Sequence, residues 1–270
     1  MKDALIVSVL SVVPRNRGAR ILGVLARSRV SRWMTRAFVA AYGVDLAEAE
    51  GELPDYPTIA ALFTRRLRPH ARPIAADPGV LVSPVDGTCA AVGTTVDQRI
   101  EVAPGRPVSL DALLDAPVDG ERDVAVLYLS PRDYHRVHVP RGGVATAWRY
   151  VPGTLWPVFP AAVRRIDELF GRNERAIVRL STDAGPLDVV LVGAFGVGRI
   201  TLSVCDLVTN TGGARSGGPL ADVPVARGEE LGVFHLGSTV ILVAPAGTWT
   251  WTVSSGDPVR LGQGIGRLNG

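Results

Sequence analysis

The stretch Val124-Ala125-Val126-Leu127-Tyr128-Leu129 is an uninterrupted apolar run that ends at Ser130-Pro131. A run of this length, rich in residues that favour extended backbone and bounded by turn residues, predicts a buried β-strand. Within the region that follows about residue 80, only Ala161–Phe170 has the spacing of a helix. Closely spaced strands with few helices between them predict an α+β fold with a β-rich, mostly antiparallel core. The other predicted strands are Val80–Ser83, Thr88–Val92, Val144–Val151, Ala176–Ser181, Leu187–Val192, Arg199–Val204 and Thr239–Ala244.

The N-terminal third is different, because its pattern is helical and rich in arginine. The apolar run Ala4–Val13 is followed by seven arginines between residues 15 and 36, interleaved with apolar residues at helical spacing. The apolar run is too short to span a bilayer as a helix, and no small-residue cleavage site follows it, which disfavours a signal peptide. We expect residues 1–70 to be a basic helical region, with a short helix at Tyr56–Leu67, and residues 71–270 to be one β-rich domain. The basic region would either pack on the core or lie at an anionic membrane surface.

The composition limits the chemistry that the chain can perform. With 270 residues, 47% hydrophobic and 20% charged, it is a folded globular chain rather than a fibrous or disordered one. Cys89 and Cys205 are too few for a disulfide framework, so we expect a reducing compartment. Lys2 is the only lysine, which excludes an internal lysine that could hold pyridoxal phosphate. We expect no nucleic-acid partner and no bound metal.

Two of the four histidines, His135 and His138, lie three residues apart in the segment Ser130–Pro140. This segment directly follows the predicted strand Val124–Leu129. Imidazole titrates near neutral pH, so the pair could transfer protons. The same two side chains could instead be metal ligands, whereas core packing explains two histidines beside Arg and Tyr poorly.

Three further segments could contribute to a site. Asp86 lies in Ser83–Gly87, on a tight turn that an ordinary hairpin would also explain. The tripeptide Asn173-Glu174-Arg175 precedes a predicted strand and fits an ordinary capped helix end, while Gly237-Ser238 begins an apolar strand three residues after His235. The glycines near residues 193–198 lack the dinucleotide-binding fingerprint, so we interpret them as a site of close sheet packing.

Taken in order along the chain, these segments resemble the pyruvoyl-dependent phosphatidylserine decarboxylase family. Leu236-Gly237-Ser238-Thr239 is similar to the self-cleavage motif of that family, and Phe63-Thr64-Arg65-Arg66-Leu67 to its lead-in to the catalytic region. Gly212–Gly218 is richer in glycine than the family pattern and could be a substrate-facing loop. The remaining matches are Ser83–Gly87, Tyr128–Pro140, Pro152–Leu155, Asn173–Arg175, Val192–Ala194 and Gly228–Ile241.

The resemblance implies a role for each candidate residue. Ser238 attacks the carbonyl of Gly237, the chain is cut between these residues, and Ser238 becomes a pyruvoyl group. This electrophilic carbonyl then accepts the electrons left when an amino acid loses CO₂. Asp86, His138 and Ser238 match the family's self-cleavage set, in which Asp86 orients His138 and His138 takes the serine proton. His135 matches the position linked to proton delivery during turnover, whereas His235 is expected to pack or to contact solvent.

The implied substrate is phosphatidylserine with ester-linked chains, and the implied products are phosphatidylethanolamine and CO₂. The resemblance also implies a peripheral enzyme on the cytoplasmic side of the cell membrane, attracted to anionic lipid through its arginines at roughly 1 kcal/mol for each. The large and small chains produced by cleavage are expected to stay associated, and a homodimer is a further expectation.

Three other interpretations remain open at this point. A serine hydrolase could use Asp86, His138 and Ser238, although the chain has no G-x-S-x-G motif. A zinc hydrolase could be built from His135, His138 and either Asp86 or His235, although H-E-x-x-H is absent. An inactive membrane-binding relative would keep the fold without the chemistry.

Overall fold

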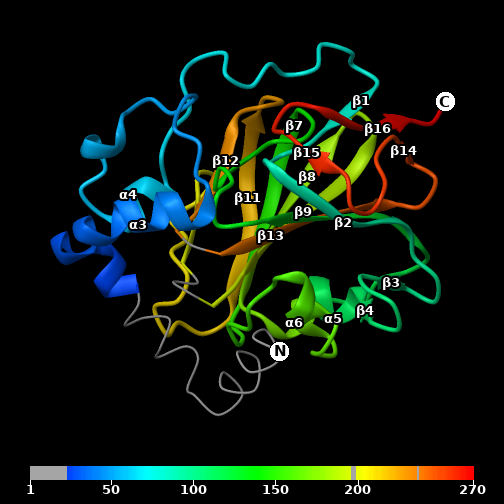
Figure 1. Ribbon diagram of the computed structural model, residues 1–270. Helices are drawn as coiled ribbons and strands as arrows, with labels where there is room; N and C mark the ends of the chain where they lie inside the picture. The colour runs from blue at the N-terminus through cyan, green and yellow to red at the C-terminus, as the bar shows by residue number, and fades with distance from the viewer. Residues whose placement is uncertain (1–22, 196–198, 236) are drawn as a thin grey trace.

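An eight-stranded antiparallel sheet forms the centre of the molecule (Figure 1). The computed structural model describes residues 23–195, 199–235 and 237–270. The expected α+β fold with a mostly antiparallel core is confirmed, and each predicted strand overlaps a strand of the structure. In spatial order the sheet consists of β11 (Ser216–Val225), β7 (Gly143–Val151), β8 (Arg175–Thr182), β9 (Gly185–Gly193), β13 (Ser238–Pro245), β5 (Arg122–Leu129), β2 (Gly87–Thr94) and β15 (Pro258–Val259).

The apolar run in β5 is uninterrupted because the sheet is covered on both faces. Side chains alternate across a strand, so Ala125, Leu127 and Leu129 enter one hydrophobic core while Val124 and Val126 enter a second. Strands β9 and β13 divide their side chains between the same two cores in the same way. A strand buried on both faces needs apolar residues at every position, which explains why this region lacks an alternating pattern.

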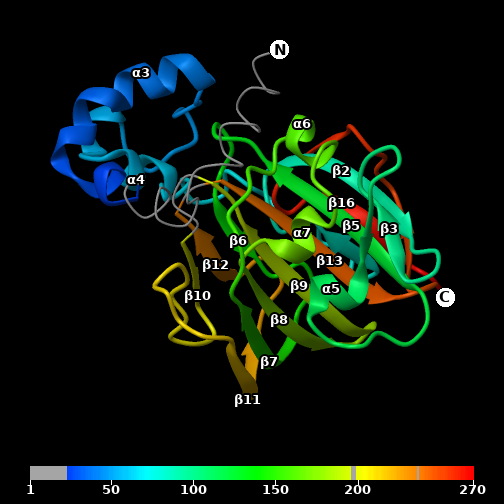
Figure 2. The ribbon, with the colours of Figure 1, turned by 90° about the horizontal axis from the view of Figure 1, so that it is seen from below.

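Two small sheets cover one face and a helical layer covers the other. The small sheets, ordered β1-β16-β14 and β10-β12-β6, comprise β1 (Val80–Val82), β16 (Gly264–Leu268), β14 (Trp249–Trp251), β10 (Ile200–Leu202), β12 (Glu230–Phe234) and β6 (Arg136–His138). Figure 2 shows helices of the opposite layer lying over the sheet. This layer contains α5 (Leu110–Leu114), α6 (Pro160–Val163), α7 (Leu169–Arg172) and the hairpin of β3 (Arg99–Glu101) and β4 (Pro107–Ser109).

The described N-terminal residues form a separate helical unit beside the sheet, seen in blue in Figure 1. It contains helical residues 23–27, η1 (Arg29–Ser31), α3 (Arg32–Tyr42), η2 (Leu53–Asp55) and α4 (Ile59–Phe63). Ala26, Ile59, Ala60 and Phe63 form a small core of their own. Among the described helices, none has the length and hydropathy needed to cross a membrane. The predicted run Ala4–Val13 lies outside the described residues, and a domain boundary near residue 70 stays a prediction.

Two predicted helices differ in the structure. Ala161–Phe170 is not one helix but the two short helices α6 and α7, because Glu168 adopts a left-handed backbone with φ of 54°. That conformation lets the Glu168 carboxylate accept hydrogen bonds from Arg99 and from the amide of Ser109. The predicted helix at Tyr56–Leu67 is limited to α4, which starts where the Thr58 side chain caps the Ala61 amide.

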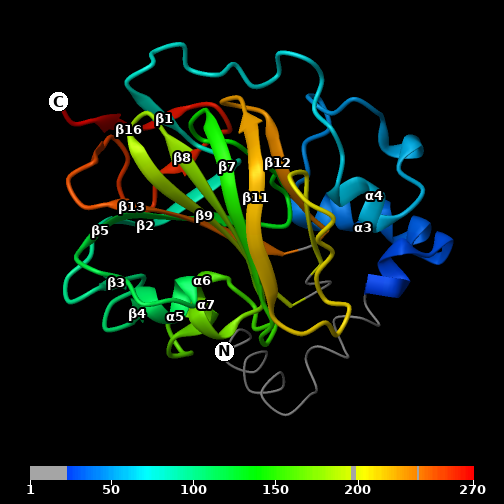
Figure 3. The same cartoon turned by 180° about the vertical axis from the view of Figure 1, so that it is seen from behind.

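The glycine-rich segment Gly212–Gly218 is not simply a loop, because its second half begins the edge strand β11 (Figure 3). Gly217 lies so close to β7 that a Cβ atom there would come 2.6 Å from the carbonyl oxygen of Trp148. The glycine therefore permits strand pairing.

Candidate active site

Ser238 is the first residue of the central strand β13 and lies at one end of the sheet. Its pairing partners are the last residues of the neighbouring strands, Leu129 of β5 and Gly193 of β9. Ser238 is 0% exposed, and its hydroxyl has no hydrogen-bond partner among the described residues. Buried hydroxyl groups are normally hydrogen bonded, so an unpartnered one at a strand end is a candidate reactive group.

The backbone before Ser238 is also unusual. Gly237 has φ of 49°, in the left-handed region that residues with a side chain rarely adopt. A Cβ atom on Gly237 would come 3.2 Å from the carbonyl oxygen of Phe195. The turn therefore requires glycine for its conformation and has little space for a side chain.

Asn173 fixes the end of β9, the strand that pairs with Ser238 on one side. Its buried side chain accepts a hydrogen bond from the amide of Trp156 and donates to the carbonyls of Trp156 and Gly193, the residue paired with Ser238. Asn173 also caps the C-terminus of α7, as the sequence suggested. The sequence did not indicate that Asn173 also positions the end of β9.

Asp86 comes to the same end of the sheet because β2 begins next to the end of β5. Gly87 lies so close to β5 that a Cβ atom would come 2.3 Å from the carbonyl oxygen of Tyr128. The Asp86 carboxylate accepts a hydrogen bond from the amide of Leu261 at 2.8 Å and is paired with the Arg72 guanidinium at 2.6 Å. This pairing raises the pKa of Arg72. Arg72 was not among the predicted site residues, because it lies in no recognisable motif.

His138 is oriented by a backbone carbonyl. Its Nδ1 lies 2.8 Å from the carbonyl oxygen of Gly228, which can only accept, so Nδ1 carries the proton and donates it. Nε2 is then the free base, and it accepts the hydroxyl proton of Tyr134 at 3.2 Å. Burial lowers the pKa of His138, so the ring is neutral at pH 7.

The described hydrogen bonds do not join the expected three residues directly. Asp86 bonds to Arg72 and Leu261, and the Nδ1 of His138, which Asp86 was expected to orient, bonds instead to Gly228. Neither His138 nor Asp86 is hydrogen bonded to Ser238 among the described residues. Asp86 still acts on His138 over a longer range, because its negative charge raises the pKa of the imidazole against the larger effect of burial.

His135 is completely buried. Its Nδ1 donates to the carbonyl of Asp133 at 2.8 Å, its ring centroid lies 4.3 Å from that of Phe63, and its Nε2 has no partner among the described residues. Burial lowers the pKa of His135 to about 3, so it is neutral at pH 7. Arg65 fixes this segment by donating to the carbonyls of Arg132 and Asp133.

His235 is half-buried and lies 3.3 Å from the hydroxyl of Thr201 through its Nε2 atom. Burial, with a smaller effect from the charge of Arg199, lowers its pKa to about 4. No group of three or more His, Cys, Asp or Glu side chains in the described part of the chain is arranged to hold a metal ion. The zinc hydrolase interpretation therefore has no ligand set there.

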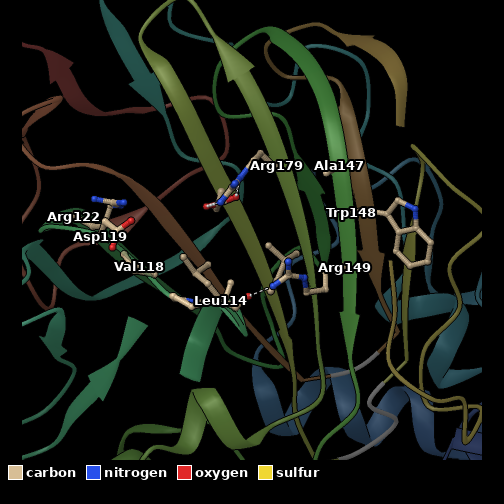
Figure 4. Close-up of a pocket in the computed structure, with 12 residues that line it drawn as sticks. Leu114, Val118, Asp119, Arg122, Ala147, Trp148, Arg149 and Arg179 are labelled. Atoms are coloured by element: carbon tan, nitrogen blue, oxygen red, sulfur yellow. Dashed lines mark hydrogen bonds and ion pairs between the residues drawn. The ribbon is translucent and has the colours of Figure 1, made fainter. Parts of the chain in front are cut away.

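Of two cavities beside the sheet, one adjoins predicted site residues and the other does not. One of about 330 Å³ lies beside Asp86 and Tyr134, between the N-terminal helical unit and the sheet. Another of about 270 Å³, drawn in Figure 4, lies over β7 and β8 and contains none of the predicted site residues. Its Arg179 is paired with Asp188, and its Arg149 donates to the carbonyls of Leu114 and Asp115. The second cavity therefore has no evident link to the chemistry.

Comparison with known proteins shows the family of the chain. The family model described as phosphatidylserine decarboxylase matches residues 59–267. A protein of Halorhodospira halophila named phosphatidylserine decarboxylase proenzyme is 44% identical, in an alignment that covers 98% of this chain and 94% of that protein. A protein of the same name from Myxococcus xanthus is 40% identical, with 98% and 99% covered. The chain belongs to the phosphatidylserine decarboxylase family.

Proposed function

We propose that this chain is a proenzyme that cuts itself between Gly237 and Ser238 and then converts phosphatidylserine to phosphatidylethanolamine and CO₂. The observation that carries the proposal is the buried, unpartnered hydroxyl of Ser238 directly after a left-handed glycine. The names of the relatives, which call them proenzymes of this decarboxylase, support the same conclusion. Because Ser238 is fully buried in the uncut chain, its hydroxyl suits an attack within the chain better than hydrolysis of an external substrate, and the lipid would reach residue 238 only after the cut separates it from Gly237.

The proposed cleavage needs no reagent other than water. The Ser238 oxygen attacks the carbonyl carbon of Gly237, the peptide bond to nitrogen breaks, and an ester forms. Loss of the α-proton of residue 238 then expels the Gly237 carboxylate, and water releases the nitrogen as ammonia to leave a pyruvoyl group. Exclusion of bulk water from the buried site favours the serine hydroxyl over water as the nucleophile.

A base must remove the Ser238 proton, and we assign this role to Nε2 of His138. The bond from Nδ1 to Gly228 fixes the tautomer that leaves Nε2 able to accept a proton. The Tyr134 hydroxyl donates to Nε2 in the structure. Before Nε2 can receive the Ser238 proton, Tyr134 must therefore either move away or relay that proton to Nε2. Asp86 would support the imidazolium cation through its negative charge.

A pyruvoyl group fits the position of Ser238 because it would lie in a buried site that excludes competing water. There it would supply an electrophilic carbonyl able to accept the electrons left by the departing CO₂. The chain's own contribution is to move a proton to the α-carbon of the substrate. We assign this role to the unpartnered Nε2 of His135, which carries no proton in the neutral ring and must take one from the substrate ammonium group before it delivers it.

The two chains made by the cleavage would stay together. The small chain begins with β13, which pairs with β9 on one side and β5 on the other, and both of these belong to the large chain. Strands β15 and β16 add further pairing with β2 and β1. Breaking one peptide bond leaves all these backbone ladders intact.

The experiment that tests the proposal is the intact mass of the purified protein under denaturing conditions. We expect a chain of residues 1–237 and a 33-residue chain of residues 238–270. The small chain should be lighter by one ammonia than a peptide that begins with serine, and the protein should release CO₂ from phosphatidylserine. A purified wild-type protein that remains one chain and releases no CO₂ would refute the proposal.

The N-terminal helical unit supports peripheral attachment to a membrane. Val30, Trp33 and Met34 lie at positions i, i+3 and i+4 and are 73%, 88% and 60% exposed. Exposed apolar residues next to Arg29, Arg32 and Arg36 suit a surface that combines acyl chains with anionic headgroups.

Combined replacement of Val30→Ser and Trp33→Ser should weaken binding to phosphatidylcholine vesicles that contain phosphatidylglycerol by at least about tenfold, because two apolar side chains no longer insert. Val96→Ser is a matched control, since Val96 is 72% exposed but lies outside the N-terminal helical unit. Co-sedimentation with the vesicles measures the effect. Equal binding by the wild-type protein and both variants would contradict this attachment.

A further inference from the structure

A third cavity, lined by two arginines, lies where the N-terminal helical unit meets the β-rich domain. Its volume is about 420 Å³, with Arg27 of helical residues 23–27 on one side and Arg199, Thr209, Asn210 and Thr211 on the other. The 208–211 segment is held firmly, because the amide of Thr209 donates to Ile200 and the amide of Asn210 donates to the buried carboxylate of Glu174. The polar side of the cavity is therefore built on fixed backbone.

Two other arginines near the proposed active site have carboxylate partners. Arg72 is paired with Asp86 and Glu48, and Arg136 is paired with Glu230. Within the described residues, neither Arg27 nor Arg199 has a carboxylate partner, and the Nε atom of Arg199 is buried without any hydrogen-bond acceptor. An uncompensated charge and a buried unpaired donor are unfavourable unless a ligand completes them.

The cavity is also close to the proposed cleavage point. Arg199 directly precedes β10, and its carbonyl accepts a hydrogen bond from the amide of His235 at 2.9 Å. His235 is three residues before Ser238 in the sequence, a separation of at most about 11 Å. The positive charges of Arg199 and Arg27 both reach His235, where they help to lower its pKa.

We infer that this cavity binds the phosphodiester of the lipid substrate through Arg27 and Arg199. The inference rests on the proposed function, because it names the part of phosphatidylserine that this side of the site receives. A guanidinium group offers a planar pair of N–H donors that matches two phosphate oxygens. With the phosphate held here, the serine end of the headgroup, which carries the amine and the carboxylate, can extend toward residue 238.

Direct binding tests the inference without turnover. We would titrate the matured wild-type protein with glycerophosphoethanolamine, a soluble molecule that carries the phosphodiester of the product. Arg27→Gln and Arg199→Gln should each weaken its binding by about tenfold or more, because each removes charge-assisted hydrogen bonds. Arg165→Gln removes the same charge from an exposed position between α6 and α7 and should leave binding unchanged. Inorganic phosphate should bind more weakly than the phosphodiester.

Kinetics distinguish a substrate site from a general lipid contact. With dihexanoyl phosphatidylserine below its micelle concentration, both cavity variants should raise KM about tenfold or more with complete self-cleavage. A KM within twofold of wild type, combined with weaker vesicle binding, would assign the arginines to the bilayer and overturn the inference. Phosphate binding as tight as phosphodiester binding would also overturn it.

These measurements separate the inference from the proposed function. If the wild-type protein releases no CO₂ from phosphatidylserine, the proposed reaction fails, while the titration still decides whether the cavity binds a phosphodiester. If CO₂ is released but glycerophosphoethanolamine binds equally to all the variants, the reaction stands and the cavity assignment is wrong.

Discussion

Ser238→Ala is expected to yield a single uncut chain of 28.6 kDa that releases no CO₂ from phosphatidylserine. The variant removes the only oxygen that the proposed mechanism uses to attack Gly237, and it also removes the source of the pyruvoyl group. The fold should survive, because the hydroxyl makes no hydrogen bond among the described residues and alanine fits the same buried position. Intact mass and CO₂ release measure the two effects, which should both be complete.

Thr239→Val provides a matched control for this substitution. Thr239 is the next residue of β13, is also fully buried, and also has a hydroxyl without a partner among the described residues. Adjacent side chains point to opposite faces of a strand, so this hydroxyl is directed away from that of Ser238. The control should be cut normally. Normal cutting of Ser238→Ala, or failure of both variants, would argue against Ser238 as the nucleophile.

The two histidines should separate maturation from turnover. His138→Gln should slow self-cleavage by about a hundredfold to ten-thousandfold, the usual contribution of a positioned general base. His135→Ala should be cut at a near-normal rate yet lose decarboxylation by a similar factor. His135 is completely buried, so His135→Asn serves as a second variant that retains a donor for the carbonyl of Asp133. Normal maturation and normal turnover of both His135 variants would contradict this division of roles.

The same assignment predicts how self-cleavage depends on pH. Burial lowers the pKa of His138 below its ordinary value near 6.5, so Nε2 is already unprotonated at pH 7. Raising the pH further should therefore not accelerate cleavage through this group. Lowering the pH should slow cleavage only when it approaches the lowered pKa, because protonation removes the base. A rate that begins to fall above pH 7 as the pH is lowered would point to a different base.

Much of the β-rich fold follows from local sequence. Each predicted strand, including Val124–Leu129 and Thr239–Ala244, overlaps a real one because apolar runs between turn residues have few alternatives in a chain of this kind. The helix predicted at Ala161–Phe170 is interrupted because Glu168 bonds to Arg99 and Ser109, which are remote in sequence. Strand β11 was missed because its glycines resemble a loop until β7 lies beside them.

The candidate site residues could also be predicted from local sequence, whereas their contacts could not. The sequence alone determined the family, the order of its motifs and the candidates Asp86, His135, His138, Gly237 and Ser238, since each belongs to a short contiguous motif. Only the tertiary structure decided their hydrogen bonds. Asp86 is paired with Arg72, 14 positions away, and His138 is oriented by Gly228, 90 positions away. The sheet brings such residues together through pairing across strands, and that pairing depends on the whole fold rather than on spacing along the chain.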